Sequence, residues 1–329
     1  MIFSGKRIFL TVAAVLLIAA IGVVAWQLTP MSASSMRNSA VIVEQKTWQE
    51  IDIDGKAHLF FSSAKGDSAL LGVTANRDSA VHHKYTTGCW VNRWAVIPSC
   101  MGRVVTTYSD CPKAPVIKSD SDIVRLCRKS IDTQMRTLKA QKAELDYYLR
   151  VHGVQDNGYQ TIAALAGRVS RAYSDVARAE RIVDSLSAGK HHRFSIRQRT
   201  EYTAVFRNNE GKITRKKMEI IANCKRLTVT LQACDRTTPD GVSVLTLANW
   251  GTSSERNICA VGYPGLGENG LECDTVSPII TPGHKTKGGK HDLPNVLASD
   301  GAPVFTSKGR FIGIITKGNI VSEFNLSKK

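Results

Sequence analysis

The segment 297–314, "LASDGAPVFTSKGRFIGI", guides the interpretation of the whole chain. Small residues lead into Gly301-Ala302-Pro303, and two short apolar runs follow with a glycine turn between them. This pattern predicts a tight turn followed by a pair of antiparallel strands. Asp300 stands in the middle of the turn, which raises the question of what a carboxylate does there.

Short β-type runs cover much of the remaining chain. From Ile51 onward they include "IDIDGKAHLFFSS", "ALLGVTA" and "GCWVNRWAVIPSC", and near the end "NICAVGYPGLGENG" and "SPIITPGHK". Gly, Asn, Asp, Ser and Pro punctuate these runs, as in all-β barrels and sandwiches. The chain is therefore predicted to be mainly β.

A helical pattern interrupts the β-type runs. Apolar residues recur every seven positions in 122–152, which ends at His152-Gly153, and they alternate in steps of three and four from Ile162 to Leu186, before Gly189. The polar turn "GVQDNG" separates the two stretches. The spacing predicts an antiparallel α-helical, coiled-coil hairpin that reaches about 45 Å. The simpler interpretation of this apolar seam is that it packs the two helices together. The functional alternative is that the helical hairpin docks a protein partner. The seam consists of Val124, Ile131, Leu138, Leu145, Ile162, Leu165, Val169, Ala172, Val176, Ala179, Val183 and Leu186.

A basic hairpin follows the helical segment. Residues 193–226 hold ten Lys and Arg against three Glu, a large share of the formal net charge of +16. A solvated strand face is the simpler interpretation, and binding of anionic lipid or polysaccharide at the envelope is the alternative. Nucleic acid is not expected, because stacking aromatics are sparse on that face. The candidate anion-binding residues are Arg193, Arg197, Arg199, Arg207 and Lys216.

The N-terminal segment predicts a membrane anchor. Lys6 and Arg7 precede an uncharged apolar run from Ile8 to Trp26, whose 19 residues are long enough for a bilayer core of about 30 Å. We expect a retained single-pass helix in contact with lipid and a body exported to the periplasmic or extracellular side. The small residues "SAS" at 32–34 keep a cleaved signal peptide open as the alternative.

The eight cysteines agree with export, because an even number in an oxidising compartment predicts disulfides. Buried free thiols are the alternative. The cysteines show no CxxC pair and no zinc-finger spacing, so neither a metal nor a cofactor is expected.

Four segments in order resemble the trypsin-like serine endopeptidase superfamily, the two-barrel fold of chymotrypsin and its bacterial relatives. They are "TGCWVNRWAVIPSC", "LQACDRTTPDGVSVLTL", "AVGYPG" and "ASDGAPVFTSKGRFIGI". The resemblance implies a trypsin-like double β-barrel, with the helical hairpin as an insertion in the first barrel. It also implies a Ser-His-Asp triad and an oxyanion hole made by two backbone N–H groups.

Carried onto this chain, the resemblance implies a degenerate triad. Asp240 occupies the carboxylate position, Cys100 (or, after a slip of one residue, Ser99) the histidine position, and Asp300 the serine position. Ala298 replaces the first glycine of the turn, which puts the oxyanion hole in doubt. We expect Asp300 to accept backbone hydrogen bonds as a structural residue.

The expected function is that of an inactive protease homologue, a binding or scaffold module at the cell envelope. The alternative is an active peptidase or hydrolase with a non-standard catalytic set. Such a set would use His82 or His83 as base, or Asp300 as nucleophile beside Asp240 or Asp292. Ser299 is expected to be a turn serine. A purely structural role also remains open.

The expected domains follow the changes of pattern. They are a cytoplasmic tail (1–7), a transmembrane anchor (8–27), a linker (28–47), the first part of the N-terminal barrel (48–117), the helical hairpin (118–190), the basic hairpin with the rest of that barrel (191–247), and the C-terminal barrel (248–329).

Overall fold

The structure is a computed structural model. It describes residues 30–66, 68–92, 101–109, 119–186, 192–245, 255–266 and 277–324, together with 12–13, 15, 17–18, 21–22, 115 and 117. The chain divides into two compact units. The barrel unit comprises Met1–Gln45, His83–Asp110 and Glu201–Lys329, and the hairpin unit comprises Lys46–His82 and Cys111–Thr200.

Six strands close into a barrel, because β7 pairs both with β8 and with β1. The order around the ring is β1, β5, β6, β9, β8, β7, and β2 (Lys56–Phe61) adds to β1 outside the ring. Closure leaves no exposed sheet edge in the ring. The six strands are β1 (Ala40–Ile53), β5 (His82–Val91), β6 (Arg103–Thr107), β7 (Phe194–Arg207), β8 (Ile213–Cys224) and β9 (Thr228–Ala233).

Strand β1 of the barrel is buried on both faces. Val41 and Val43 pack in one apolar cluster with Trp90 and Leu231, whereas Ala40 and Ile42 pack in another. Successive side chains of a strand point to opposite faces, so one strand contributes to two cores. The second cluster also includes residues of the C-terminal sheet, which joins this sheet to the barrel.

The C-terminal part of the barrel unit forms a five-stranded antiparallel sheet, ordered β11, β10, β12, β13, β14. The turn and strand pair predicted from 297–314 are confirmed as β12 and β13. Among the described residues this sheet does not close into a second barrel, so the expectation of two closed barrels is met only in part. The strands are β10 (Asn257–Gly262), β11 (Ile279–His284), β12 (Pro303–Thr306), β13 (Phe311–Thr316) and β14 (Asn319–Val321), with a short 3-10 turn η2 at Lys287–Gly289.

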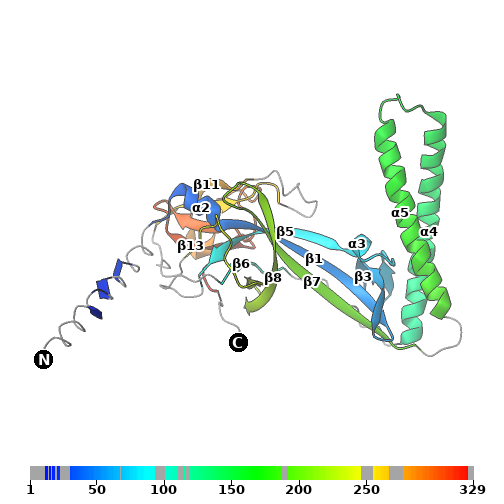
Figure 1. Cartoon of the computed structure of the whole chain (residues 1–329), viewed down its shortest axis with the longest axis horizontal. Coiled ribbons are helices and arrows are strands. Elements are labelled where there is room, and N and C mark those ends of the chain that lie inside the picture. The colour runs from blue at the N-terminus through cyan, green and yellow to red at the C-terminus, as the bar shows by residue number, and fades with distance from the viewer. Residues whose placement is uncertain are drawn as a thin grey trace. The chain divides into compact units, whose positions relative to one another are not determined.

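The hairpin unit is built on two long helices, α4 (Asp120–Val151) and α5 (Tyr159–Leu186). They lie side by side along their length (Figure 1), as the helical pattern predicted. Ser119 is the N-cap residue of α4, and the helix ends with His152 as its C-cap, at the predicted position. The unit also contains the short elements β3 (Ser63–Lys65), β4 (Ala69–Leu71) and α3 (Arg77–Ala80).

Most of the burial in the helical hairpin lies toward one end. In α4 every buried residue lies between Ile123 and Ile131, and in α5 between Val169 and Val183. Apart from Ser130 and Val169, these residues share a core with Leu59, Phe61 and other strand residues of the same unit. Apart from Val169, the predicted seam therefore becomes a buried core only at the base of the pair, because strands cover the helices there.

The predicted membrane anchor lies mostly outside the described residues, and those of its residues that are described are helical. Within the described part of the chain, no helix combines the length and the apolar character that a membrane crossing requires. The segment 28–47, predicted to be a linker, contains regular secondary structure. It contains helix α2 (Ala33–Ser39), followed by the start of β1, where Val41, Ile42 and Val43 supply a buried β-branched run.

The described cysteines are free thiols. They are Cys89, Cys127, Cys224, Cys234 and Cys259, whereas Cys100, Cys111 and Cys273 lie outside the described residues. A disulfide set that uses all eight cysteines is therefore not supported. Burial raises the pKa of the Cys127 thiol to about 12, which keeps this thiol protonated and unreactive at neutral pH.

The units also group the strands differently from the expected domains. The compact hairpin unit includes Lys46–His82, which the sequence pattern assigned mainly to the first barrel. The reason is packing, since Ile51, Ile53, Leu59 and Phe61 share a core with α4 and α5.

Candidate functional site

The turn at 298–302 is docked onto the barrel by backbone hydrogen bonds. The Thr87 N–H of β5 donates to the Asp300 carbonyl at 3.1 Å, and the Gly301 N–H donates to the Ile315 carbonyl at 2.7 Å. Gly301 has φ 90°, and a Cβ there would overlap the Thr87 carbonyl oxygen. The turn therefore requires glycine both for its dihedral angle and for the close approach of β5.

Asp300 acts as a hydrogen-bond acceptor for a neighbouring turn. Its Oδ1 accepts the backbone N–H of Lys317 at 2.9 Å. Lys317 and Gly318 join β13 to β14, and both have positive φ, 49° and 74°, as in a two-residue hairpin turn. The carboxylate therefore links two turns, which agrees with the structural role expected for Asp300.

The backbone donors of the expected oxyanion hole are not both free. The Ala298 N–H, two residues before Asp300, donates to the Pro294 carbonyl at 2.9 Å. The Ala298 methyl group is buried in the core of the C-terminal sheet. An oxyanion hole needs preorganised donors that point at the reacting oxygen, and here one of them already has an acceptor.

Among the described residues, the Ser299 side chain contacts another hydroxyl group. Its Oγ lies 2.9 Å from Thr87 Oγ1. Thr106 Oγ1 in turn donates to the Thr87 carbonyl at 2.6 Å and lies 3.1 Å from Thr86 Oγ1. This set of contacts fastens the turn to β5 and joins β5 to β6. It contains no group that can take a proton from Ser299 at neutral pH.

The three residues predicted for the triad positions are not seen together. Asp240 is exposed in a turn and borders a surface groove with the β7–β8 turn. None of the residues that line this groove is a partner of Asp300. Cys100, like Ser99, lies outside the described residues.

Most of the described histidines are held by carboxylates. His83 Nδ1 lies 3.0 Å from Glu44 Oε1, which also accepts a hydrogen bond from Tyr85. His284 pairs with Asp292, and their hydrogen bonds lower the pKa of the Asp292 carboxyl. Further His–Asp pairs are His152–Asp156 and His192–Asp54. Among the described residues, no histidine has a hydrogen bond to Ser299.

The candidate anion-binding residues have acidic or carbonyl partners on the protein itself. Arg197 Nε lies 2.9 Å from Asp52 Oδ2, and Arg199 Nε lies 2.6 Å from Glu50 Oε1. Lys216 Nζ lies 3.0 Å from Asp235 Oδ2. In addition, Arg207 donates to the Gly211 carbonyl, and the backbone N–H of Arg193 donates to Asp54. Ion pairing at three of the five positions lowers the charge that this face offers to an anion.

The acidic partners on β1 were missed in the sequence interpretation. Glu50 and Asp52 are buried and lie on one face of β1, opposite the two arginines of β7. The signal was present in the sequence, because Glu44, Glu50 and Asp52 all occupy even positions of one strand. Only the pairing of β1 with β7 connects them to the arginines.

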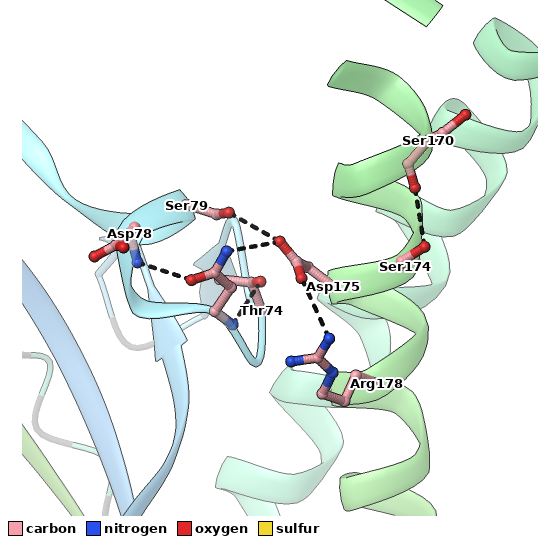
Figure 2. A network of polar contacts seen from close by, with 8 residues as sticks. Thr74, Asp78, Ser79, Ser170, Ser174, Asp175 and Arg178 are labelled. Atoms are coloured by element: carbon pink, nitrogen blue, oxygen red, sulfur yellow. Dashed lines mark hydrogen bonds and ion pairs between the residues drawn. The ribbon is translucent and has the colours of Figure 1, made fainter. Parts of the chain in front are cut away.

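A second polar network was also missed. Asp175 of α5, with a side chain only 14% exposed, accepts hydrogen bonds from Asn76 Nδ2 at 2.9 Å and from Ser79 Oγ at 3.1 Å. Asn76 in turn caps helix α3 by accepting the Asp78 N–H. Figure 2 shows the contact between Asp175 of α5 and Ser79. The network fastens α5 to α3 within the hairpin unit, and nothing in its local sequence pattern indicates the pairing.

Comparisons with known proteins identify no family. No family model matches the chain, and no curated protein matches it. Among solved structures, the crystal structure of Deg5 is similar at 11% sequence identity, over 85% of this chain and 79% of that chain, with a TM-score of 0.33. A likeness at this level carries no argument about activity.

Proposed function

We propose that the protein is a catalytically inactive homologue of the trypsin-like endopeptidases that serves as a binding or scaffold module at the cell envelope. The observation that carries the proposal is the bonding of the turn at 298–302. Asp300 holds the Lys317 N–H, and the Ala298 N–H is bonded to Pro294. Acyl transfer needs a hydroxyl nucleophile with a base beside it and two free backbone donors for the oxyanion. This turn provides neither.

Two features support the trypsin-like part of the proposal. A closed six-stranded barrel precedes a second antiparallel sheet, and the turn packs against β5 and β6 of that barrel. The turn also keeps its Gly-Ala-Pro sequence where the Gly301 backbone approaches β5. The envelope location rests on the apolar run from Ile8 to Trp26.

Fluorophosphonate labelling of the full-length protein tests inactivity. We expect no serine to be labelled in the wild type, and none in the Ser299→Ala variant. Stoichiometric labelling that disappears in Ser299→Ala would contradict the proposal and favour an active serine hydrolase. A hydrolytic activity that Asp300→Asn abolishes, with an unchanged melting temperature, would contradict it in favour of a carboxylate-dependent enzyme.

The distal half of the helical hairpin is the surface that we assign to a protein partner. Tyr147, Val151 and Val154 expose 64%, 55% and 60% of their surface there, and in α4 no residue beyond Ile131 is buried. A photo-crosslinking residue at Val154 should yield one defined adduct in cells, whereas one at Lys129, exposed in the half of α4 near the base of the hairpin, should yield none. Equal adducts from both positions, or none from Val154, would exclude this assignment.

A further inference from the structure

A cavity of about 80 Å³ lies in the barrel unit, where β1 begins and β7 ends. Its wall is mainly apolar, and much of it comes from buried strand residues. Segment 241–242 closes one side, held in place because the Ser243 N–H donates to the Asn38 carbonyl at 3.0 Å. The apolar residues that matter for its shape are Ala40, Ile42, Val205, Ile213 and Val242.

Two arginines border this cavity, Arg37 at the end of α2 and Arg207 at the end of β7. Both are exposed residues, and none of the described residues that line the cavity is acidic. Tyr263 lies between the apolar and the charged parts, and its buried hydroxyl donates to the Ala40 carbonyl at 3.2 Å. Burial raises the pKa of Tyr263, while the nearby charge of Arg207 opposes this change. The surroundings are thus apolar inside and cationic at the edge.

The size of the cavity limits what can enter. A cavity of roughly 150 Å³ lined by aliphatic residues admits benzene, so a cavity of about half that volume fits a branched group of about three to five carbon atoms. A larger ligand would place only such a group inside and keep the rest in solvent. Arginine is suited to hold a carboxylate beside that group, because its planar guanidinium can donate two parallel hydrogen bonds.

We propose that this cavity binds a carboxylate carried on a short branched aliphatic group, with the aliphatic part inside and the carboxylate at Arg37 and Arg207. Two sources share this chemistry, namely a free short-chain acid and the C-terminus of a peptide that ends in leucine. The inference does not depend on whether the Asp300 turn is catalytic.

Calorimetric titration of the full-length protein tests the proposal with defined probes. We expect saturable binding of 4-methylpentanoate, with a Kd in the millimolar range or tighter, and at least about tenfold weaker binding of 4-methylpentanamide. A short peptide ending in leucine, compared with its C-terminal amide, forms the second arm. Binding in only one arm identifies the source of the ligand, and binding in either arm supports the proposal.

Variants separate the roles of the cavity and of the arginines. Val242→Phe and Ile213→Phe fill the cavity from partly buried positions, so both should abolish binding while the melting temperature stays close to that of the wild type. Arg207→Gln should weaken binding of the acid about tenfold. Arg310→Gln removes the same charge from an exposed position outside the cavity and should leave the Kd unchanged.

Three results would overturn the inference. They are absence of saturable binding in both arms, equal affinity for the acids and their amides, and unchanged binding in a folded cavity-filling variant. If one of the two phenylalanine variants fails to fold, the other provides the measurement.

Discussion

The turn at 298–302 is held mainly by backbone groups, whereas the base of the helical hairpin is held by buried side chains. Gly301 approaches the Thr87 carbonyl so closely that no side chain fits, and neighbouring N–H groups of the turn have defined acceptors. Ile131 and Val183, by contrast, are members of an apolar cluster. Backbone docking tolerates almost no change, whereas an apolar core loses stability in proportion to what is removed.

Gly301→Ala should give the largest effect and tests the backbone side of this comparison. The added methyl group would overlap the Thr87 carbonyl oxygen at a positive φ, so we expect a loss of about 3 kcal/mol or more in the free energy of unfolding. Urea denaturation of the full-length protein measures it.

Gly318→Ala is the matched control, because Gly318 also has a positive φ but has open space around its Cα. It should cost only about 1 kcal/mol, from the dihedral angle alone. Equal losses in the two variants would show that the docking of the turn on β5 contributes nothing.

Ile131→Ala tests the side-chain part of the comparison and should rank second. Ile131 is 1% exposed in the core at the base of the hairpin, so its truncation should cost about 2–4 kcal/mol. Leu165→Ala, in the distal half and 37% exposed, should cost less than about 1 kcal/mol. A distal substitution as costly as Ile131→Ala would mean that a partner or a second copy covers the arm.

Asp175→Ala measures how much a polar network adds to that apolar base. It leaves Asn76 and Ser79 without their acceptor, so we expect a loss of about 1–2 kcal/mol. Asp146→Ala breaks a half-exposed ion pair with Lys142 on α4 and should cost only about 0.5 kcal/mol or less. If Asp175→Ala costs no more than this control, the contact between α5 and α3 is dispensable.

His291 should produce the smallest effect, a weak dependence of stability on pH in the barrel unit. Burial lowers its pKa from the usual 6.5, so below that pH the unfolded chain binds more protons than the folded one. Stability should therefore decrease as the pH falls from about 7 through 6, and His291→Gln should flatten this slope. An unchanged slope of the melting temperature against pH in the variant would exclude His291 as the cause.

The helical hairpin was largely predictable, and the candidate site was predictable only in part. Helix periodicity and the capping residues near Ser119 and His152 act within a few turns of the chain, so they appear in the local sequence. The turn around Asp300 and the strands on either side of Gly309 were likewise visible. The acceptor role of Asp300 was expected, but its donor, Lys317, was not identified.

The long-range partners were not visible in the sequence. Arg197 and Arg199 suggested a basic surface, and only the pairing of β1 with β7 places Asp52 and Glu50 against them. The free thiols of Cys89 and Cys127 likewise depend on burial. Cysteine number alone could not distinguish a disulfide set from thiols buried at separate places in the core.

The sequence by itself determined many of the strands after Ile51, the helical pair, and where glycine must permit a turn, but it did not show the start of β1. These features depend on interactions between residues close together in the chain. The tertiary structure decided the closure of the barrel, the neutralisation of two arginines by buried carboxylates, the bonding of the turn amides, and the cavity beside Arg37 and Arg207. Each of these brings together residues far apart in the sequence, and the local pattern does not record which partner each residue will meet.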